Sequence, residues 1–242
     1  MPFTFSHPAI LLPFAKASPR WVSFTGLVVG SLTPDFEYFI RMKIQSTFSH
    51  SITGLFSFDL PLGILLSFVF HNIIRNPLYN NLPSSIGKRL LKYQSFQWND
   101  YFKGHWVIVV ASVILGAASH LFWDAFTHGH GYFINRILAL TNSISFMGYS
   151  MPVYQFLQHL SSVVGGIAIC IFILLLPVDR SIAGVGSKYY WPTLIMIALI
   201  IISIRVLMGF DQNIFGQLIG TAISAIVIAL ILTPLLGRKK YI

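Results

Sequence analysis

Charged residues are scarce in this chain. Its 242 residues include 16 lysines and arginines and 7 aspartates and glutamates, so only 10% are charged whereas 55% are hydrophobic. A soluble globular domain carries about 25% charged residues. The composition therefore predicts an integral membrane protein. The single cysteine, Cys170, lies inside an apolar run, which leaves no disulfide framework within the chain.

Several catalytic signatures are also missing. The sequence has no G-x-S-x-G, H-E-x-x-H or C-x-x-C motif and no phosphate-binding Walker loop. These absences argue against the serine hydrolases, zinc proteases and nucleotide hydrolases that such motifs define. The net charge of +9 comes from lysines and arginines in short loops, where they would face anionic lipid headgroups. We therefore expect membrane lipids as partners and no nucleic acid.

Five apolar runs are long enough, or nearly so, to cross about 30 Å of hydrocarbon. They are Ile52–Ile74, Trp106–Trp123, Val153–Leu176, Tyr190–Met208 and Ile214–Leu236. A shorter run, Trp21–Leu32, ends just before Thr33-Pro34, where the proline favours a helix boundary. We expect an all-α, polytopic bundle of about five transmembrane helices plus a short re-entrant or interfacial N-terminal helix. It would form one membrane domain, 1–242, with a motif-bearing core at 1–178 and two additional transmembrane helices at 179–242.

Basic residues are distributed unevenly among the loops. They crowd the loop Arg75–His105, the loop after Asp179 and the C-terminal tail, whereas the loop Asp124–Pro152 carries only Arg136. Because cytoplasmic loops hold an excess of lysine and arginine, the crowded loops are expected in the cytoplasm. The N-terminal section departs from this pattern, since four of its basic residues fall on the other side: Lys16, Arg20, Arg41 and Lys43.

Imidazole and carboxylate groups gather at the end of the second long run. His120, Asp124 and His128 are spaced at i, i+4 and i+8, so a helix would place them on one face, about 6 Å apart along its axis. Ionisable groups are costly at membrane depth and mark functional sites there. The loop charges place further candidates on the same, non-cytoplasmic side: Asp35, Glu37, His50 and His159.

Metal binding is the chemistry that these residue types favour. Zinc takes histidine nitrogen and aspartate oxygen readily, and the mixed donor set also suits manganese or iron. We predict a divalent metal, zinc first, as one or two ions. Other interpretations stay open: His120 and Asp124 form a hydrogen bond within one helix, His159 bonds to a neighbouring helix, and His128 and His130 lie in a wet loop.

Four blocks of the sequence resemble a known family. In order, they are MPFTFSHPA, GSLTPDFEYF, SHSITGLFSFDLPLG and GAASHLFWDAFTH. They are similar to an uncharacterised family of bacterial and archaeal membrane proteins, which is related to membrane-bound metal-dependent hydrolases. The matching blocks cover about the first two thirds of the chain. The resemblance implies an integral protein of a prokaryotic cytoplasmic membrane.

The order of candidate ligands also resembles that of the zinc-dependent phospholipases C. This resemblance implies two overlapping ligand sets: Asp35, His50, His120 and Asp124 for one metal, and Asp124 with His7 for a second. Those enzymes add a later H-x-x-x-E ligand pair. Here Val163 stands four residues after His159, which argues against a third metal.

The leading hypothesis is a membrane-bound hydrolase that cleaves a phosphoester of a lipid or another membrane-surface substrate with a metal-activated water. In this hypothesis Asp124 bridges the metals. Glu37, two residues after Asp35, either supports a metal ligand by a hydrogen bond or acts as general base. The oligomeric state and the substrate itself stay open.

The rival hypothesis is a small transporter, or a non-catalytic membrane protein, that uses the same histidines and aspartates as an ion or proton site. A transporter often contains inverted repeats, and the sequence has none. Asp59 is the residue that suits transport best, because it lies well inside the first long run. Its alternative role is to satisfy backbone groups freed by Pro61.

Overall fold

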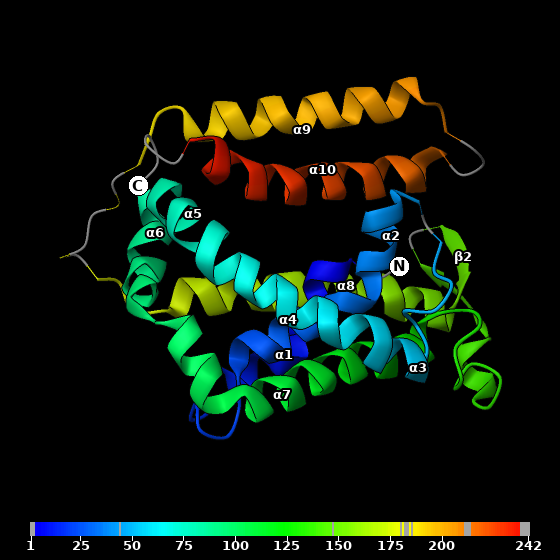
Figure 1. The fold of residues 1–242 in the computed structure, drawn as a ribbon. Helices are drawn as coiled ribbons and strands as arrows, with labels where there is room; N and C mark the ends of the chain where they lie inside the picture. The colour runs from blue at the N-terminus through cyan, green and yellow to red at the C-terminus, as the bar shows by residue number, and fades with distance from the viewer. Residues whose placement is uncertain are drawn as a thin grey trace. The chain divides into compact units, whose positions relative to one another are not determined.

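The computed structural model describes residues 3–43, 45–146, 148–179, 181, 184, 186–210 and 214–237. This part of the chain is helical apart from one short β-hairpin (Figure 1). The first half contains η1 (Thr4–Lys16), α1 (Phe24–Gly30), η2 (Thr33–Asp35), α2 (Phe36–Arg41), α3 (Ile52–Gly54), η3 (Leu55–Asp59), α4 (Leu60–Val69), η4 (Phe70–Ile74), α5 (Arg75–Asn81), α6 (Ser84–Leu90) and η5 (Leu91–Ser95). There follow α7 (Trp98–Thr127), η6 (Leu138–Leu140), β1 (Ser143–Phe146), β2 (Tyr149–Pro152), α8 (Val153–Leu175), α9 (Tyr190–Leu207) and α10 (Ile214–Leu236).

Five helical runs among the described residues are long and apolar enough to cross a membrane. They are Ile52–Asn81, Trp98–Thr127, Val153–Leu175, Tyr190–Leu207 and Ile214–Leu236. These runs confirm the predicted all-α fold and its five spans. The short run at Trp21–Leu32 contains α1, whose seven residues extend for about 10 Å, too little to cross the bilayer.

The chain folds as two compact units. The first comprises Met1–Pro34, Phe48–Ile64 and His105–Phe172. The second comprises Asp35–Thr47, Leu65–Gly104 and Ile173–Ile242.

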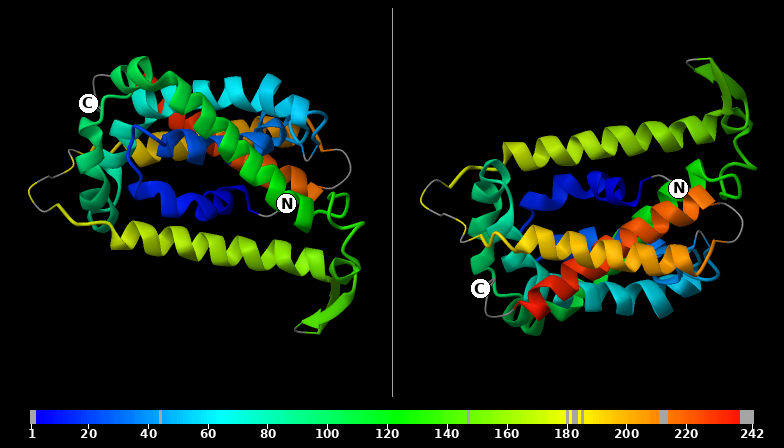
Figure 2. Two further views of the ribbon diagram at one scale, coloured as in Figure 1. Left: turned by 90° about the horizontal axis from the view of Figure 1, so that it is seen from below. Right: turned by 90° about the horizontal axis from the view of Figure 1, so that it is seen from above.

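In the first unit, η1 lies alongside α8 (Figure 2). Pro8 and Pro13 lie inside η1, where they remove backbone donors, and the segment adopts a 3₁₀ rather than an α conformation. The Ser6 hydroxyl donates to the carbonyl of Ser162 in α8 at 2.7 Å. Gly165 permits this close approach, because a Cβ there would stand 2.8 Å from the Ser6 carbonyl oxygen. The N-terminal segment is therefore fixed against a membrane-spanning helix.

Helix α1 packs against α7 in the same unit. The backbone N–H of Ser23, the N-cap of α1, donates to the Ser112 hydroxyl of α7 at 2.9 Å. Gly30 and Gly116 lie where the two backbones meet, and a Cβ on either would overlap the opposite backbone. Small residues at such a contact let membrane helices approach closely. This contact fixes the end of α1 beside the C-terminal half of α7.

In the second unit, α9 and α10 run side by side as a hairpin (Figures 1 and 2). Their contact surface is built from six buried residues: Tyr190, Leu194, Ile197, Ala198, Ala225 and Ala229. The Ser224 hydroxyl of α10 donates to the Phe39 carbonyl of α2 at 2.6 Å. The hairpin is thereby connected to the short helix that follows Asp35.

Candidate metal centre

Asp124 occupies the last turn of α7 and is 8% exposed. Four imidazole nitrogens surround its carboxylate, two on each oxygen. Oδ1 lies 3.7 Å from His7 Nε2 and 3.4 Å from His128 Nδ1. Oδ2 lies 3.6 Å from His50 Nε2 and 3.3 Å from His120 Nε2. Three separate segments of the first unit, namely η1, the residues before α3 and the end of α7, thus converge on one carboxylate.

These nitrogen–oxygen distances are longer than those of a direct ion pair. A charge-assisted hydrogen bond between nitrogen and carboxylate oxygen is about 2.7–2.9 Å long. Two ligands of one tetrahedral zinc, each about 2.1 Å from the ion, stand about 3.4 Å apart. The ligand atoms of His50, His120 and Asp124 lie within 4.8 Å of one another, as one ion requires. The spacing around Asp124 is therefore that of a group of residues able to hold a metal ion.

The tautomer of His120 follows from its hydrogen bond to α1. Its Nδ1–H donates to the carbonyl oxygen of Ser31 at 2.8 Å, because a carbonyl can only accept. Neutral His120 then carries its lone pair on Nε2, the atom that faces Asp124. Histidines that bind metals commonly donate their other ring N–H to a carbonyl or carboxylate in this way. The ring is completely buried, so its orientation is fixed.

His7 stacks on His120, with ring centroids 3.7 Å apart and an interplanar angle of 16°. Two imidazolium cations at this separation would repel each other, by about 1 kcal/mol even at the dielectric constant of water. The stacked pair is therefore expected to carry at most one positive charge. Neutral imidazoles present lone pairs toward Asp124, and a cation between them and the carboxylate would balance the charge.

The cluster is closed on one side and open on the other. The side chains of His7 and His120 are 4% and 0% exposed, whereas those of His50 and His128 are 23% and 32% exposed. His50 Nδ1 lies 3.1 Å from the Ser49 hydroxyl. His128 Nε2 lies 3.4 Å from the amide nitrogen of Gln158 in α8. His50 and His128 thus mark the side of the cluster that is nearest the surface, and Asp124 itself is buried.

His128 lies beside Asp124, as the i, i+4 spacing predicts, and not in the wet loop that was the alternative interpretation. Its backbone N–H donates to the Asp124 carbonyl at 3.1 Å, so the helical register continues one residue past Thr127. The i, i+4 spacing from Asp124 was the signal for this placement, and the neighbouring glycines obscured it. His130, two residues later, is exposed.

Three more residues that the sequence singles out are His159, Asp35 and Asp59. His159 is exposed on α8 and is absent from the groups of metal-binding geometry found among the described residues. Asp35 is 2% exposed and belongs to the second unit, whose first residue it is. Its role as a ligand stays a prediction. Asp59 is completely buried at the end of the π-helix η3, which ends just before Pro61.

Glu37 is buried in α2 among donors from its own segment. Its carboxylate accepts hydrogen bonds from Arg41 Nε at 3.0 Å, from Ser46 Oγ at 3.1 Å, and from the backbone N–H and hydroxyl of Thr47 at 2.9 and 2.6 Å. These bonds hold the end of α2 to the residues that follow it. They account for the burial of Glu37, and its role as general base stays a prediction.

The fold and this cluster define a polytopic helical membrane protein with buried His/Asp groups that could hold a metal ion. The chain belongs to the family described as a domain of unknown function (DUF4184), whose model matches residues 1–235. No curated protein and no solved structure matches the chain. The family is uncharacterised, so the chemistry has to be argued from the site.

Proposed function

We propose that this protein is a membrane-bound, metal-dependent hydrolase that cleaves a phosphoester of a lipid or another membrane-surface substrate. One observation supports it above the others: Asp124 lies 3.3–3.7 Å from four imidazole nitrogens, with two nitrogens on each carboxylate oxygen. A buried carboxylate between two pairs of histidines has the form of a bridging ligand for two cations.

The residues divide into two proposed ligand sets. His50 and His120 would bind one ion together with Asp124, because the ligand atoms of these three residues lie within 4.8 Å of one another. His7, whose Nε2 lies 3.7 Å from Asp124 Oδ1, would help Asp124 to hold a second ion. Nitrogen and oxygen donors in this number favour zinc, and manganese or iron would also suit them. A bound divalent ion would supply a nucleophilic water at neutral pH and would stabilise negative charge on the leaving oxygen.

Ser31 and the chain around the cluster supply orientation. The hydrogen bond from His120 Nδ1 to the Ser31 carbonyl keeps Nε2 directed at the carboxylate. The stack of His7 on His120 holds a second ring nearly parallel to the first. The side chains of His50 and His128 are partly exposed, so a substrate would reach the buried carboxylate from the side of these two residues.

Location supports a membrane substrate. Asp124 lies three residues before the end of α7, itself one of the five spanning candidates. A group at the end of a spanning helix lies near the headgroup region, where lipid esters are found. We further infer from the loop charges that this end faces the non-cytoplasmic side.

A second candidate is an ion or proton carrier. The observation that favours it is Asp59, completely buried inside the first spanning run at the end of a π-helix. Single π-helical turns within α-helices often lie at functional sites. In this alternative the cluster around Asp124 would bind an ion without hydrolysing an ester.

The test compares Asp124→Asn with Asp100→Asn, a matched control near the other end of α7, where the side chain is exposed. We expect purified wild-type protein and the control to bind zinc and to hydrolyse bis(p-nitrophenyl) phosphate. Asp124→Asn should weaken zinc binding more than about 100-fold, since even indirect support of a ligand is worth 10- to 100-fold. Its hydrolysis should fall to background.

The outcomes separate the two candidates. Zinc bound in the wild type without any hydrolysis of phosphodiesters or phospholipids would favour the carrier. Wild-type protein that binds no divalent metal, or Asp124→Asn that retains it, would overturn the proposal.

A further inference from the structure

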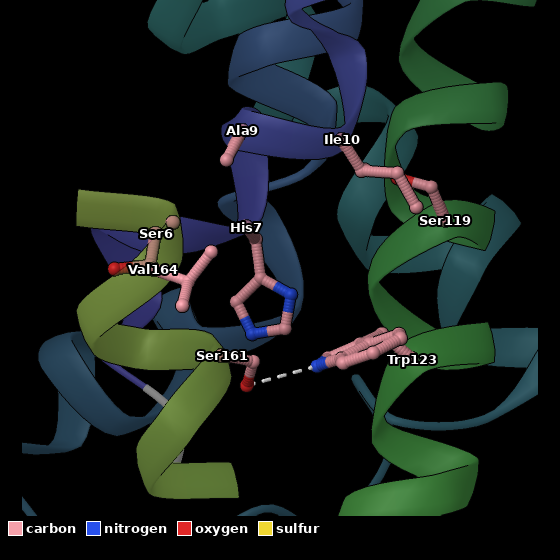
Figure 3. A pocket seen from close by; sticks show the side chains of 9 residues that line it. Ser6, His7, Ala9, Ile10, Ser119, Trp123, Ser161 and Val164 are labelled. Atoms are coloured by element: carbon pink, nitrogen blue, oxygen red, sulfur yellow. Dashed lines mark hydrogen bonds between the residues drawn. The ribbon is translucent and has the colours of Figure 1, made fainter. Parts of the chain in front are cut away.

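A cavity of about 240 Å³ adjoins His7 in the first unit (Figure 3). It lies between η1, α7 and α8, and its walls include Ala9 and Ile10, Trp123 and Val164. The imidazole of His7 projects between the two spanning helices toward Trp123 and Ser161 in Figure 3. Since His7 Nε2 lies 3.7 Å from Asp124, the cavity ends beside the proposed hydrolytic site.

The serine hydroxyls of the cavity wall donate their protons to backbone carbonyls of the protein. Ser6 donates to the Ser162 carbonyl at 2.7 Å, and Ser119 donates to the Gly116 carbonyl at 2.7 Å. Ser161 donates to the Gln158 carbonyl at 3.1 Å and accepts from Trp123 Nε1 at 3.2 Å. The serine hydroxyls therefore have no proton left to donate to a guest, and apart from these serines and His7 the wall is mostly apolar. A polar guest would lose hydrogen bonds to water without replacing them.

The rim of the cavity carries exposed apolar side chains. Ile10 and Val164, on opposite walls, are 52% and 55% exposed. Beside them on α8 stand further exposed apolar side chains, Val163 and Ile167, on a helix apolar enough to span the membrane. The molecules that surround such a helix are lipid chains.

We propose that this cavity holds a segment of an acyl chain of a membrane lipid whose polar head lies at Asp124. This inference rests on the proposed function, because it identifies the substrate of that same site as an amphiphile with an ester near its head. The volume suits part of a ligand, since pockets for whole drug-sized molecules measure about 300–1,000 Å³. One face of the His7 ring would then contact the acyl chain. The same ring belongs to the cluster around Asp124, where the reacting lipid head would lie.

The experiment measures lipid retention by native mass spectrometry of the full chain in detergent, titrated with dioleoyl phosphatidylglycerol. Val164→Phe fills the cavity from α8. Val163→Phe is the matched control, because Val163 is the preceding residue, is 60% exposed and does not line the cavity. We expect wild type and control to bind one lipid tightly, and Val164→Phe to bind it at least tenfold more weakly. Equal affinities in the two variants would overturn the inference.

Two further measurements keep the test decisive. If Val164→Phe does not fold, Ile10→Trp fills the cavity from η1, with Phe14→Trp as its control on the same segment. Glycerol 3-phosphate, a headgroup without chains, should fail to displace the lipid. If glycerol 3-phosphate displaced the bound lipid at the same concentration as the intact lipid does, the binding would be assigned to the head alone. That result would overturn the inference.

Zinc content measured on the same samples separates the two proposals. A wild type that binds zinc while Val164→Phe retains lipid would refute the acyl-chain cavity and leave the hydrolase proposal standing. A wild type without zinc would refute the hydrolase proposal, whatever the lipid titration gives.

Discussion

Replacing Gly116 by alanine should disturb the metal centre from a distance. Gly116 lies on α7 where α1 crosses it, four residues before His120. A Cβ there would overlap the Leu27 carbonyl oxygen and stand 2.8 Å from Ser31 N. Since both neighbours are backbone atoms, α1 must move as a whole to relieve the overlap.

The size of the effect follows from this geometry. The optimal separation of non-bonded heavy atoms is about 3.5–4.0 Å, so Ser31 must move away from α7 by about 1 Å. The hydrogen bond from His120 Nδ1 to the Ser31 carbonyl, now 2.8 Å long, would stretch beyond hydrogen-bonding distance. Overpacking of this kind costs about 1–3 kcal/mol of stability. Loss of the bond that orients a ligand lowers metal affinity about 10- to 100-fold.

Gly166→Ala is the control, because its Cβ would meet only the Ser6 hydroxyl oxygen, at 3.7 Å. Zinc affinity would be measured by competition with a chromophoric chelator, and stability by thermal unfolding in detergent. We expect Gly116→Ala to lose both affinity and stability and Gly166→Ala to keep both. If Gly116→Ala were measurably destabilised but bound zinc with wild-type affinity, the position of α1 would not control metal binding at Asp124. That result would refute the prediction.

Two further predictions concern the ligand set and the membrane side. His128→Ala should lower the zinc stoichiometry or affinity, because His128 Nδ1 lies 3.4 Å from Asp124, whereas a substitution of the exposed His130 by alanine should change neither. Equal zinc titrations of the two variants would remove His128 from the site. A cysteine at the exposed position Ser150 should react with an impermeant thiol reagent on intact cells, whereas one at Ser95 in the basic loop should not; the reverse labelling pattern would place the centre in the cytoplasm.

Hydropathy alone predicted the five spanning helices. It placed the ends of the first two too early in the chain. The first run continues through the polar residues of α5 to Asn81. Arg75 makes this continuation stable, because its guanidinium donates to the carbonyls of Gln94 and Phe96 at 2.9 and 2.8 Å. These partners lie about twenty residues away in sequence, so an apolar window cannot reveal them.

The candidate metal centre was predictable where its residues share one helix. The spacing of His120 and Asp124 identified them as neighbours, and their side chains lie 3.3 Å apart at the nearest atoms. The rotation of a helix about its axis is harder to predict. In α8, Gln158 is buried while His159 beside it is exposed, and packing against η1 decides which of them faces inward. The sequence of η1 gave no local signal for that packing.

The zinc K-edge X-ray absorption spectrum of the purified full chain, loaded with zinc and washed, tests the central claim most directly. We predict bound zinc with a first shell of nitrogen and oxygen at about 2.0–2.1 Å and the outer-shell scattering of more than one imidazole per ion. Absence of retained zinc, or a spectrum without imidazole scattering, would contradict a metal centre built around Asp124.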